Sequence, residues 1–98
     1  MSSMVVTMVE GQVDPDREEA LLATFSGTTD TLPSAMVESF LLRAEDANTW
    51  RIVSVWRSRE ELDSYRASVE TPGAFMIFRA AGVEPTLTVF EVASHAAN

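Results

Sequence analysis

The chain of 98 residues contains no cysteine, no lysine and a single histidine, His95, close to its C-terminal end. Without cysteine, disulfides, thiolate metal sites and a cysteine nucleophile are excluded. One histidine cannot serve a Ser-His-Asp triad from a terminal tail, because tails are seldom well ordered. The sequence also shows no glycine-rich phosphate loop and no cluster of metal ligands. Carboxylates and arginine-assisted deprotonation are therefore the acid–base options that remain.

Basic charge is scarce as well, since 15 acidic residues stand against 7 basic ones and the net charge is -8. All of the basic residues are arginine. A nucleic-acid-binding protein needs a basic stripe, and an anionic membrane surface attracts basic segments, so this composition argues against both partners. The longest unbroken apolar run, Ala74 to Phe78, is far too short to span a bilayer. Residues 1–3 carry no signal-like pattern, and we expect a cytoplasmic protein.

What the chain does contain is a regular alternation of strand and helix patterns. β-branched and apolar residues predict strands over residues 4–13, 35–44, 49–57 and 86–92. Helical spacing and capping residues predict helices that begin at Asp14, at Arg59 and at Ala74. The end of the first helix is left open between Gly27 and Thr31. Gly11 indicates a bulge or a close backbone approach, and Gly82 a helix C-cap.

The order strand, helix, strand, strand, helix, strand predicts an α+β fold of the ferredoxin-like, split βαβ type. We expect a single domain over residues 1–98, with a core of about 4–93 and a tail of 94–98. Helices should cover one face of a four-stranded antiparallel sheet. The strands at 35–44 and 49–57 are apolar on both faces, however, so the other face also needs a cover. A second copy packed sheet against sheet provides one, and we expect a homodimer.

The junction between the third strand and the following helix is the most informative stretch. Trp56 ends the strand, and Ser58 is a helix N-cap with Glu61 three residues later, which is the pattern of a capping box. Tyr65 then falls on the inner face of the helix. A strand end that faces a helix is a common place for a ligand pocket, so the functional site is expected here.

This junction, Val55-Trp56-Arg57-Ser58-Arg59-Glu60-Glu61-Leu62-Asp63-Ser64-Tyr65, is similar to the W-x-S-x-E-x-(apolar) segment of the antibiotic biosynthesis monooxygenase family. The chain resembles that family from about Val5 to Val92. The resemblance implies a dimeric α/β barrel with an aromatic-lined pocket between sheet and helices in each subunit. Family members that oxidise polycyclic phenols use molecular oxygen without flavin, metal or haem, because the deprotonated substrate supplies the electrons. The function implied is a cofactor-independent monooxygenase for an aromatic, polyketide-like or quinol substrate.

Three residues are the catalytic candidates on this interpretation. Tyr65 would hydrogen-bond a phenol or carbonyl oxygen of the substrate, and Arg79 would stabilise developing negative charge. Glu38 shares the strand parity of Met36 and Phe40, so it is expected to be buried with a raised pKa. Each has a structural alternative: helix packing for Tyr65, a solvated position for Arg79, and an ion pair or the dimer interface for Glu38.

The substrate-binding candidates are Trp56, Phe40, Phe75 and Phe78, which would line the pocket with aromatic rings or else fill the core. Trp50 is a candidate for the dimer contact. The haem-degrading branch of the fold ligates iron through a helix histidine, whereas here Phe75 and Phe78 occupy the short helix, which argues against haem. A non-catalytic ligand-binding dimer and a structural dimer are the alternatives. A cavity beside Trp56 and Tyr65 would favour the enzyme or the binding protein, and a filled core the structural dimer.

Overall fold

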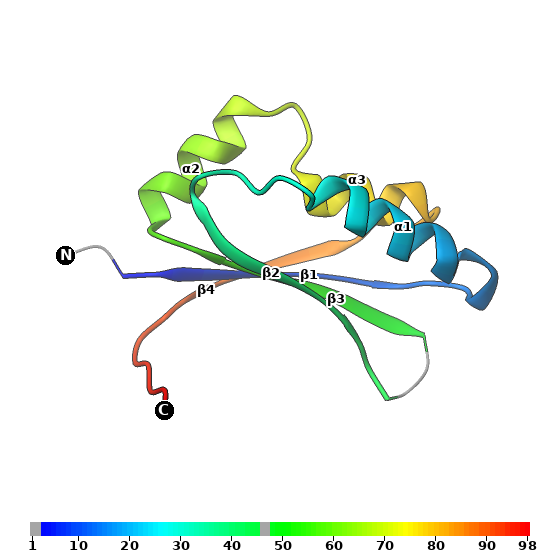
Figure 1. The fold of residues 1–98 in the computed structure, drawn as a ribbon, viewed down its shortest axis with the longest axis horizontal. Coiled ribbons are helices and arrows are strands. Elements are labelled where there is room, and N and C mark those ends of the chain that lie inside the picture. Colours follow the sequence, from blue (N-terminus) through cyan, green and yellow to red (C-terminus); the bar gives the residue numbers. More distant parts are fainter. Residues whose placement is uncertain (1–2, 46–47) are drawn as a thin grey trace.

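The computed structural model describes residues 3–45 and 48–98. Its elements are β1 (Val5–Gln12), a 3-10 helix η1 (Pro15–Arg17), α1 (Glu18–Thr28), β2 (Met36–Arg43), β3 (Thr49–Trp56), α2 (Arg59–Ser68), α3 (Gly73–Ala80) and β4 (Thr86–Glu91). The strands form an antiparallel sheet in the order β2-β3-β1-β4. Figure 1 shows α1, α2 and α3 together on one face of this sheet. The ferredoxin-like fold and all four predicted strands are confirmed, with boundaries that differ by a residue or so.

The core lies between the sheet and the helices. Alternate residues of β1 and β3 point to the helices and are buried, as the two-residue period of a strand requires. They pack in two clusters, one around Phe78 and Leu21 and the other around Trp56 and Leu62. Trp50 belongs to the first cluster at 3% exposure, beneath the guanidinium of Arg43, which lies 4.6 Å from its ring. Trp50 was predicted as a candidate for the dimer contact. That prediction is wrong, because the side chain of Trp50 is buried under the helices.

A β-bulge in β2 alters which residues share a face. Met36 pairs with Trp56, but Glu38 pairs with Val55, so Val37 is the extra residue. Met36 consequently faces the helices, while Glu38 and the residues that alternate with it face away from them. The sequence pattern placed Met36 and Glu38 on one face, which is wrong because a strict two-residue period does not anticipate an inserted residue.

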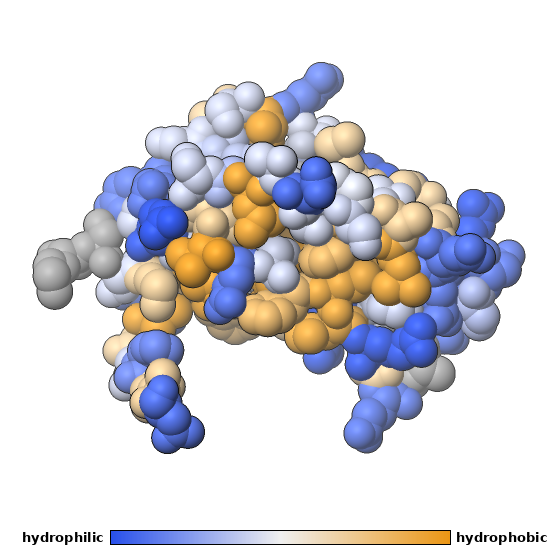
Figure 2. Space-filling view, viewed as in Figure 1, coloured by the Kyte–Doolittle hydropathy of each residue, from blue (hydrophilic) through white to orange (hydrophobic). Residues whose placement is uncertain are grey.

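No helix of the described residues covers the second face of the sheet, which we call the open face. Its apolar members, from all four strands, are Val6, Met8, Phe40, Leu42, Val53, Val55 and Phe90. Phe40, Leu42 and Phe90 are 44%, 46% and 46% exposed. Figure 2 shows hydrophobic surface at the level of the sheet, below the helices. The prediction that both sheet faces are apolar is therefore confirmed for the described strands.

Two glycines fix the position of α3. A Cβ on Gly11 of β1 would lie 2.7 Å from Val83 Cγ1 and 3.1 Å from Phe78 Cδ1, so the predicted close approach is confirmed. Gly82 has a positive φ of 79°. Its N–H donates to Arg79 O, and the Val83 N–H donates to Phe78 O, both at 3.0 Å. These bonds form a Schellman motif, which ends α3 at the predicted glycine.

The helices of the described residues include none that is both long enough and apolar enough to cross a membrane.

Candidate functional site

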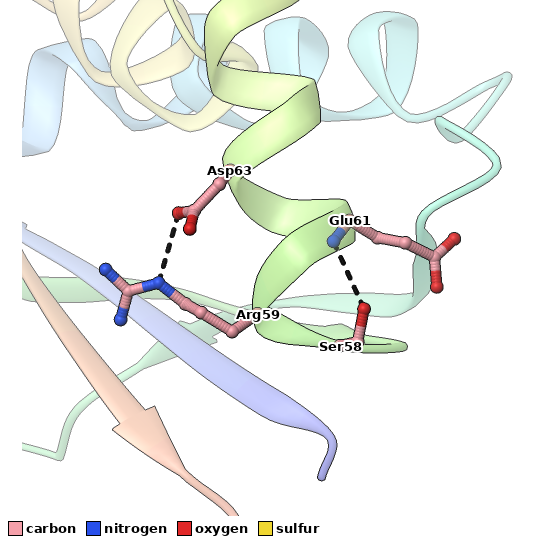
Figure 3. Close-up of polar contacts among 4 residues, drawn as sticks. All are labelled: Ser58, Arg59, Glu61 and Asp63. Carbon is pink, nitrogen blue, oxygen red and sulfur yellow. Dashed lines mark hydrogen bonds and ion pairs between the residues drawn. The ribbon is translucent and has the colours of Figure 1, made fainter. Parts of the chain in front are cut away.

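The junction of β3 and α2 is held by its predicted N-cap. Ser58 Oγ accepts a hydrogen bond from the Glu61 N–H at 3.1 Å, while the Glu61 carboxylate points away from Ser58 (Figure 3). Only the serine half of the capping box is therefore present. Arg59 and Asp63 form an ion pair at 3.0 Å on the outer face of the helix (Figure 3). The cap starts α2 directly after Trp56, so the helix turns back over the strand end.

A cavity of about 240 Å³ lies between the sheet and the helices beside this junction. Its walls come from every layer of the fold: α2 and α3, the sheet, and the end of α1 with the start of the next loop, which contribute Thr28, Thr29, Thr31, Leu32 and Pro33. Apolar atoms dominate its surface, as in most small-molecule sites. A cavity in the predicted place favours an enzyme or a ligand-binding protein over a structural dimer with a filled core.

Aromatic side chains form one wall of the cavity. The rings of Trp56 and Tyr65 lie 5.0 Å apart between centroids at an angle of 41°. Trp56 Nε1 donates to Thr7 Oγ1 at 2.9 Å, which fixes the indole in the buried layer. The Tyr65 hydroxyl accepts from the Gly73 N–H at 3.1 Å, which ties α2 to the first residue of α3. Phe75 adds a third ring to the lining.

The floor of the cavity, in the middle of the sheet, carries polar side chains among apolar ones. Thr7, Ser39 and Ser54 line it, and Ser39 Oγ and Ser54 Oγ lie 3.0 Å apart in hydrogen-bonding contact. Thr7 and Ser54 are 6% and 3% exposed. Among the described residues that line the cavity, Arg66 carries the only charge. The described part of the lining therefore offers hydrogen-bond donors and one cation, and no carboxylate or histidine.

The structure brings three of the predicted site residues together at the cavity, namely Trp56, Tyr65 and Phe75. Phe78 is fully buried at 0% exposure and packs behind the cavity in the core cluster. Its packing against Gly11 explains this position, because the missing side chain of Gly11 leaves room for the ring at the sheet.

Glu38 and Phe40 lie on the open face, away from the cavity. Both are exposed in the single chain, so the expected burial of Glu38 between sheet and helices is wrong. The physical reason is the bulge at Val37, which separates these residues from Met36, the member of their predicted face that does line the cavity.

Arg79 also lies outside the cavity. Its guanidinium makes two hydrogen bonds with the Glu84 carboxylate, at 2.9 and 2.7 Å, and lies 5.6 Å from the centre of the Phe75 ring. The hydrogen bond between them lowers the pKa of Glu84 and raises the pKa of Arg79. Arg79 therefore supports the outer side of the wall that Phe75 presents to the cavity.

Several lining residues were not found from the sequence: the hydroxyls of Thr7, Ser39 and Ser54, the cation Arg66, and the group Thr28, Thr29, Thr31, Leu32 and Pro33. The sequence did offer a signal for two of them. Thr7 and Ser54 are polar, yet they alternate with the apolar residues that each strand buries. Arg66 follows Tyr65 directly and gave no pattern of its own.

Comparisons with known proteins agree on the fold. The model of the antibiotic biosynthesis monooxygenase family matches residues 4–75, and the chain belongs to that family. No curated protein matches the chain in sequence.

Solved structures with the same fold come from several organisms. A variant of SnoaB, a cofactor-independent oxygenase from Streptomyces nogalater, is 18% identical with a TM-score of 0.74, over 99% of this chain and 100% of that one. Rv0793 from Mycobacterium tuberculosis is 19% identical with a TM-score of 0.67, over 97% and 100%. A conserved protein from Methanosarcina mazei is 9% identical with a TM-score of 0.72, over 92% and 93%. At these identities the likeness establishes the fold alone.

Proposed function

We propose that the protein is a cofactor-independent monooxygenase that uses O₂ to oxidise a small aromatic, polyketide-like or quinol substrate. The observation that carries this proposal is the apolar cavity of about 240 Å³ walled by Trp56, Tyr65 and Phe75. Its size lies near the lower end of small-molecule sites and suits a compact, flat ring system. Membership of the antibiotic biosynthesis monooxygenase family supports the same reaction class.

For this reaction the protein needs only to bind the substrate and to stabilise its anion electrostatically. An anthrone-type substrate loses a ring-methylene proton to solvent, and the resulting carbanion gives electrons to O₂. A carbon–oxygen bond forms, the peroxide loses its second oxygen as water, and the methylene becomes a carbonyl. Hydrogen-bond donors aimed at the substrate oxygen stabilise the anion before oxygen reacts. Tyr65 is the proposed catalytic donor, and Trp56 and Phe75 are the proposed ring contacts.

Oxygen uptake tests the proposal directly. The wild-type protein is mixed with a panel of anthrones, hydroquinones and quinols, and O₂ consumption is compared with the same mixtures without protein. Turnover above the uncatalysed rate, with one carbonyl gained per O₂ consumed, supports the proposal. Rates equal to the protein-free control across the panel contradict it for these substrates.

Binding without catalysis is a second candidate function. The observation in its favour is the absence of carboxylate and histidine from the described residues that line the cavity, which leaves no strong base beside a bound ligand. Saturable binding of a panel member with no increase in its oxidation rate would identify this function.

We also propose that a second copy of the chain covers the open face. The exposed side chains of Phe40, Leu42 and Phe90 form an apolar surface on the open face, which no helix of the described residues covers. Apolar patches of this kind mark association surfaces, and twofold pairing is the commonest closed arrangement. Sedimentation equilibrium at micromolar concentration should give twice the chain mass. A mass equal to one chain would exclude the homodimer.

A further inference from the structure

The three hydroxyls on the cavity floor form a row that crosses three strands. Ser39 of β2 is the register partner of Ser54 of β3, and Ser54 is the register partner of Thr7 of β1. All three side chains point to the helix-covered face, and all three line the cavity. Their neighbours along each strand on this face are apolar or aromatic, so the row is a polar stripe across an apolar floor.

Some hydroxyl protons of this row have no acceptor among the described residues. Thr7 Oγ1 accepts the proton of Trp56 Nε1, and within the described part of the chain it makes no other side-chain bond, so its own proton is left for a ligand. In the Ser39–Ser54 pair one hydroxyl donates to the other, which leaves the proton of the second. A buried hydroxyl without an acceptor is costly, and a ligand oxygen would remove that cost.

A further donor lies on the aromatic wall. The Tyr65 oxygen accepts from Gly73 N–H, which leaves its phenolic proton for the cavity. The donors thus come from the floor and from the wall, while the described lining contains no anionic acceptor. Such a lining selects against a ligand that brings only donors and favours one with exposed acceptor oxygens.

We propose that the row Ser39–Ser54–Thr7 is a subsite that binds a carbonyl or phenolate oxygen of an aromatic ligand. The oxygen-bearing edge of the ligand faces the sheet, and its ring face lies against Trp56. This inference rests on the proposed function only in taking the ligand to be aromatic. It assigns to the row the selection of oxygenated rings over hydrocarbons, at about tenfold in affinity for each hydroxyl that is used.

The test compares two probes of similar shape. 1,4-Naphthoquinone carries two acceptor oxygens and naphthalene carries none, and both are added to the intact chain in equilibrium dialysis under argon. The variants are Thr7→Val, which keeps the side-chain shape, and Ser54→Ala, which is a smaller change if the first folds poorly. Thr86→Val is the matched control, because Thr86 is exposed at the start of β4 and does not line the cavity.

The readout is the ratio of the two dissociation constants, which general damage to the fold does not change. We expect Ser54→Ala to weaken naphthoquinone binding about tenfold, with naphthalene binding and the Thr86→Val control unaltered. Thr7→Val also removes the acceptor of Trp56 Nε1, so it should weaken the binding of both probes, and that of naphthoquinone about tenfold more. Equal loss for both probes, or no loss for either, would overturn the subsite while leaving an aromatic pocket in place. Failure of the wild-type protein to bind either probe would overturn the proposed function and the subsite together.

Discussion

Each face of the sheet carries residues that depart from the usual relation between polarity and burial. The helix-covered face buries Thr7 and Ser54, whereas the open face exposes Phe40 and Phe90. An isolated sheet of this kind normally keeps its apolar residues under the helices and its polar residues in water. The buried hydroxyls lie at the cavity that we propose binds a ligand, and the exposed rings lie on the face that we propose binds a second copy of the chain. The contrast shows that alternation along one strand can encode two different surfaces.

The largest expected effect is a difference in the free energy of unfolding between substitutions on the two faces of the sheet. Phe78→Ala opens a cavity in the core under the helices and should lower the free energy of unfolding by about 3–5 kcal/mol. The matched change on the open face, Phe90→Ala, should act mainly on association, so its effect on stability should grow with protein concentration. Urea unfolding followed by circular dichroism at two protein concentrations measures both. Equal, concentration-independent losses would mean that the faces do not differ.

The next effect concerns association alone. Phe40→Asp places a charge on the open face, midway along the edge strand β2, and should raise the dimer dissociation constant by about a hundredfold. Leu22→Asp is the control, because Leu22 is 47% exposed on the helix layer, close to the 44% of Phe40. Sedimentation velocity should show single chains for the first variant and wild-type mass for the second. A wild-type mass for both would remove the open face as the contact.

A smaller effect belongs to the covered face. Tyr65→Phe removes the hydroxyl that faces the cavity and should lower kcat/KM in oxygen uptake about tenfold, mostly through kcat if the bond strengthens as the anion forms. Ser68→Ala, on the same helix, removes a hydroxyl that donates to the Tyr65 carbonyl oxygen and does not line the cavity, so it serves as the control. Unchanged kcat/KM in Tyr65→Phe would exclude Tyr65 as the catalytic donor.

The smallest effect tests a pair on the outer surface. The lowered pKa of Glu84, caused by its hydrogen bond from Arg79, means that the pair stabilises the fold above the ordinary carboxyl pKa. That contribution is lost as the pH falls through the lowered pKa, and it is small because both side chains are exposed. Arg79→Ala should therefore leave kcat/KM unchanged and slightly reduce the acid-side stability. A large drop in kcat/KM would place Arg79 in the reaction.

The parts of the fold that follow from local chemistry were predictable from the sequence. The Ser58 cap, the Gly82 C-cap and the strand period of Ile52 to Trp56 depend on neighbouring residues, and each is present. The pocket beside Trp56 and Tyr65 followed from the same junction. The bulge at Val37 was not predictable, because it depends on how β2 pairs with β3, and it moved Glu38 and Phe40 to the open face.

The hydroxyl row escaped prediction for a similar reason. Thr7, Ser39 and Ser54 are distant in sequence and become neighbours only through strand register. Taken singly, each is an ordinary small polar residue in a strand. Their shared face and their spare protons appear only after the strands are paired.

The missing side chain of Gly11 determines how closely α3 approaches the sheet, and therefore the height of the cavity between them. Helix α3 rests on β1 where a methyl group would meet Val83 at 2.7 Å, and the same helix supplies Ala74, Phe75 and Ile77 to the cavity. Any side chain at position 11 must lift that helix or displace Val83 and Phe78. The height of the cavity thus depends on a residue that does not itself line the cavity.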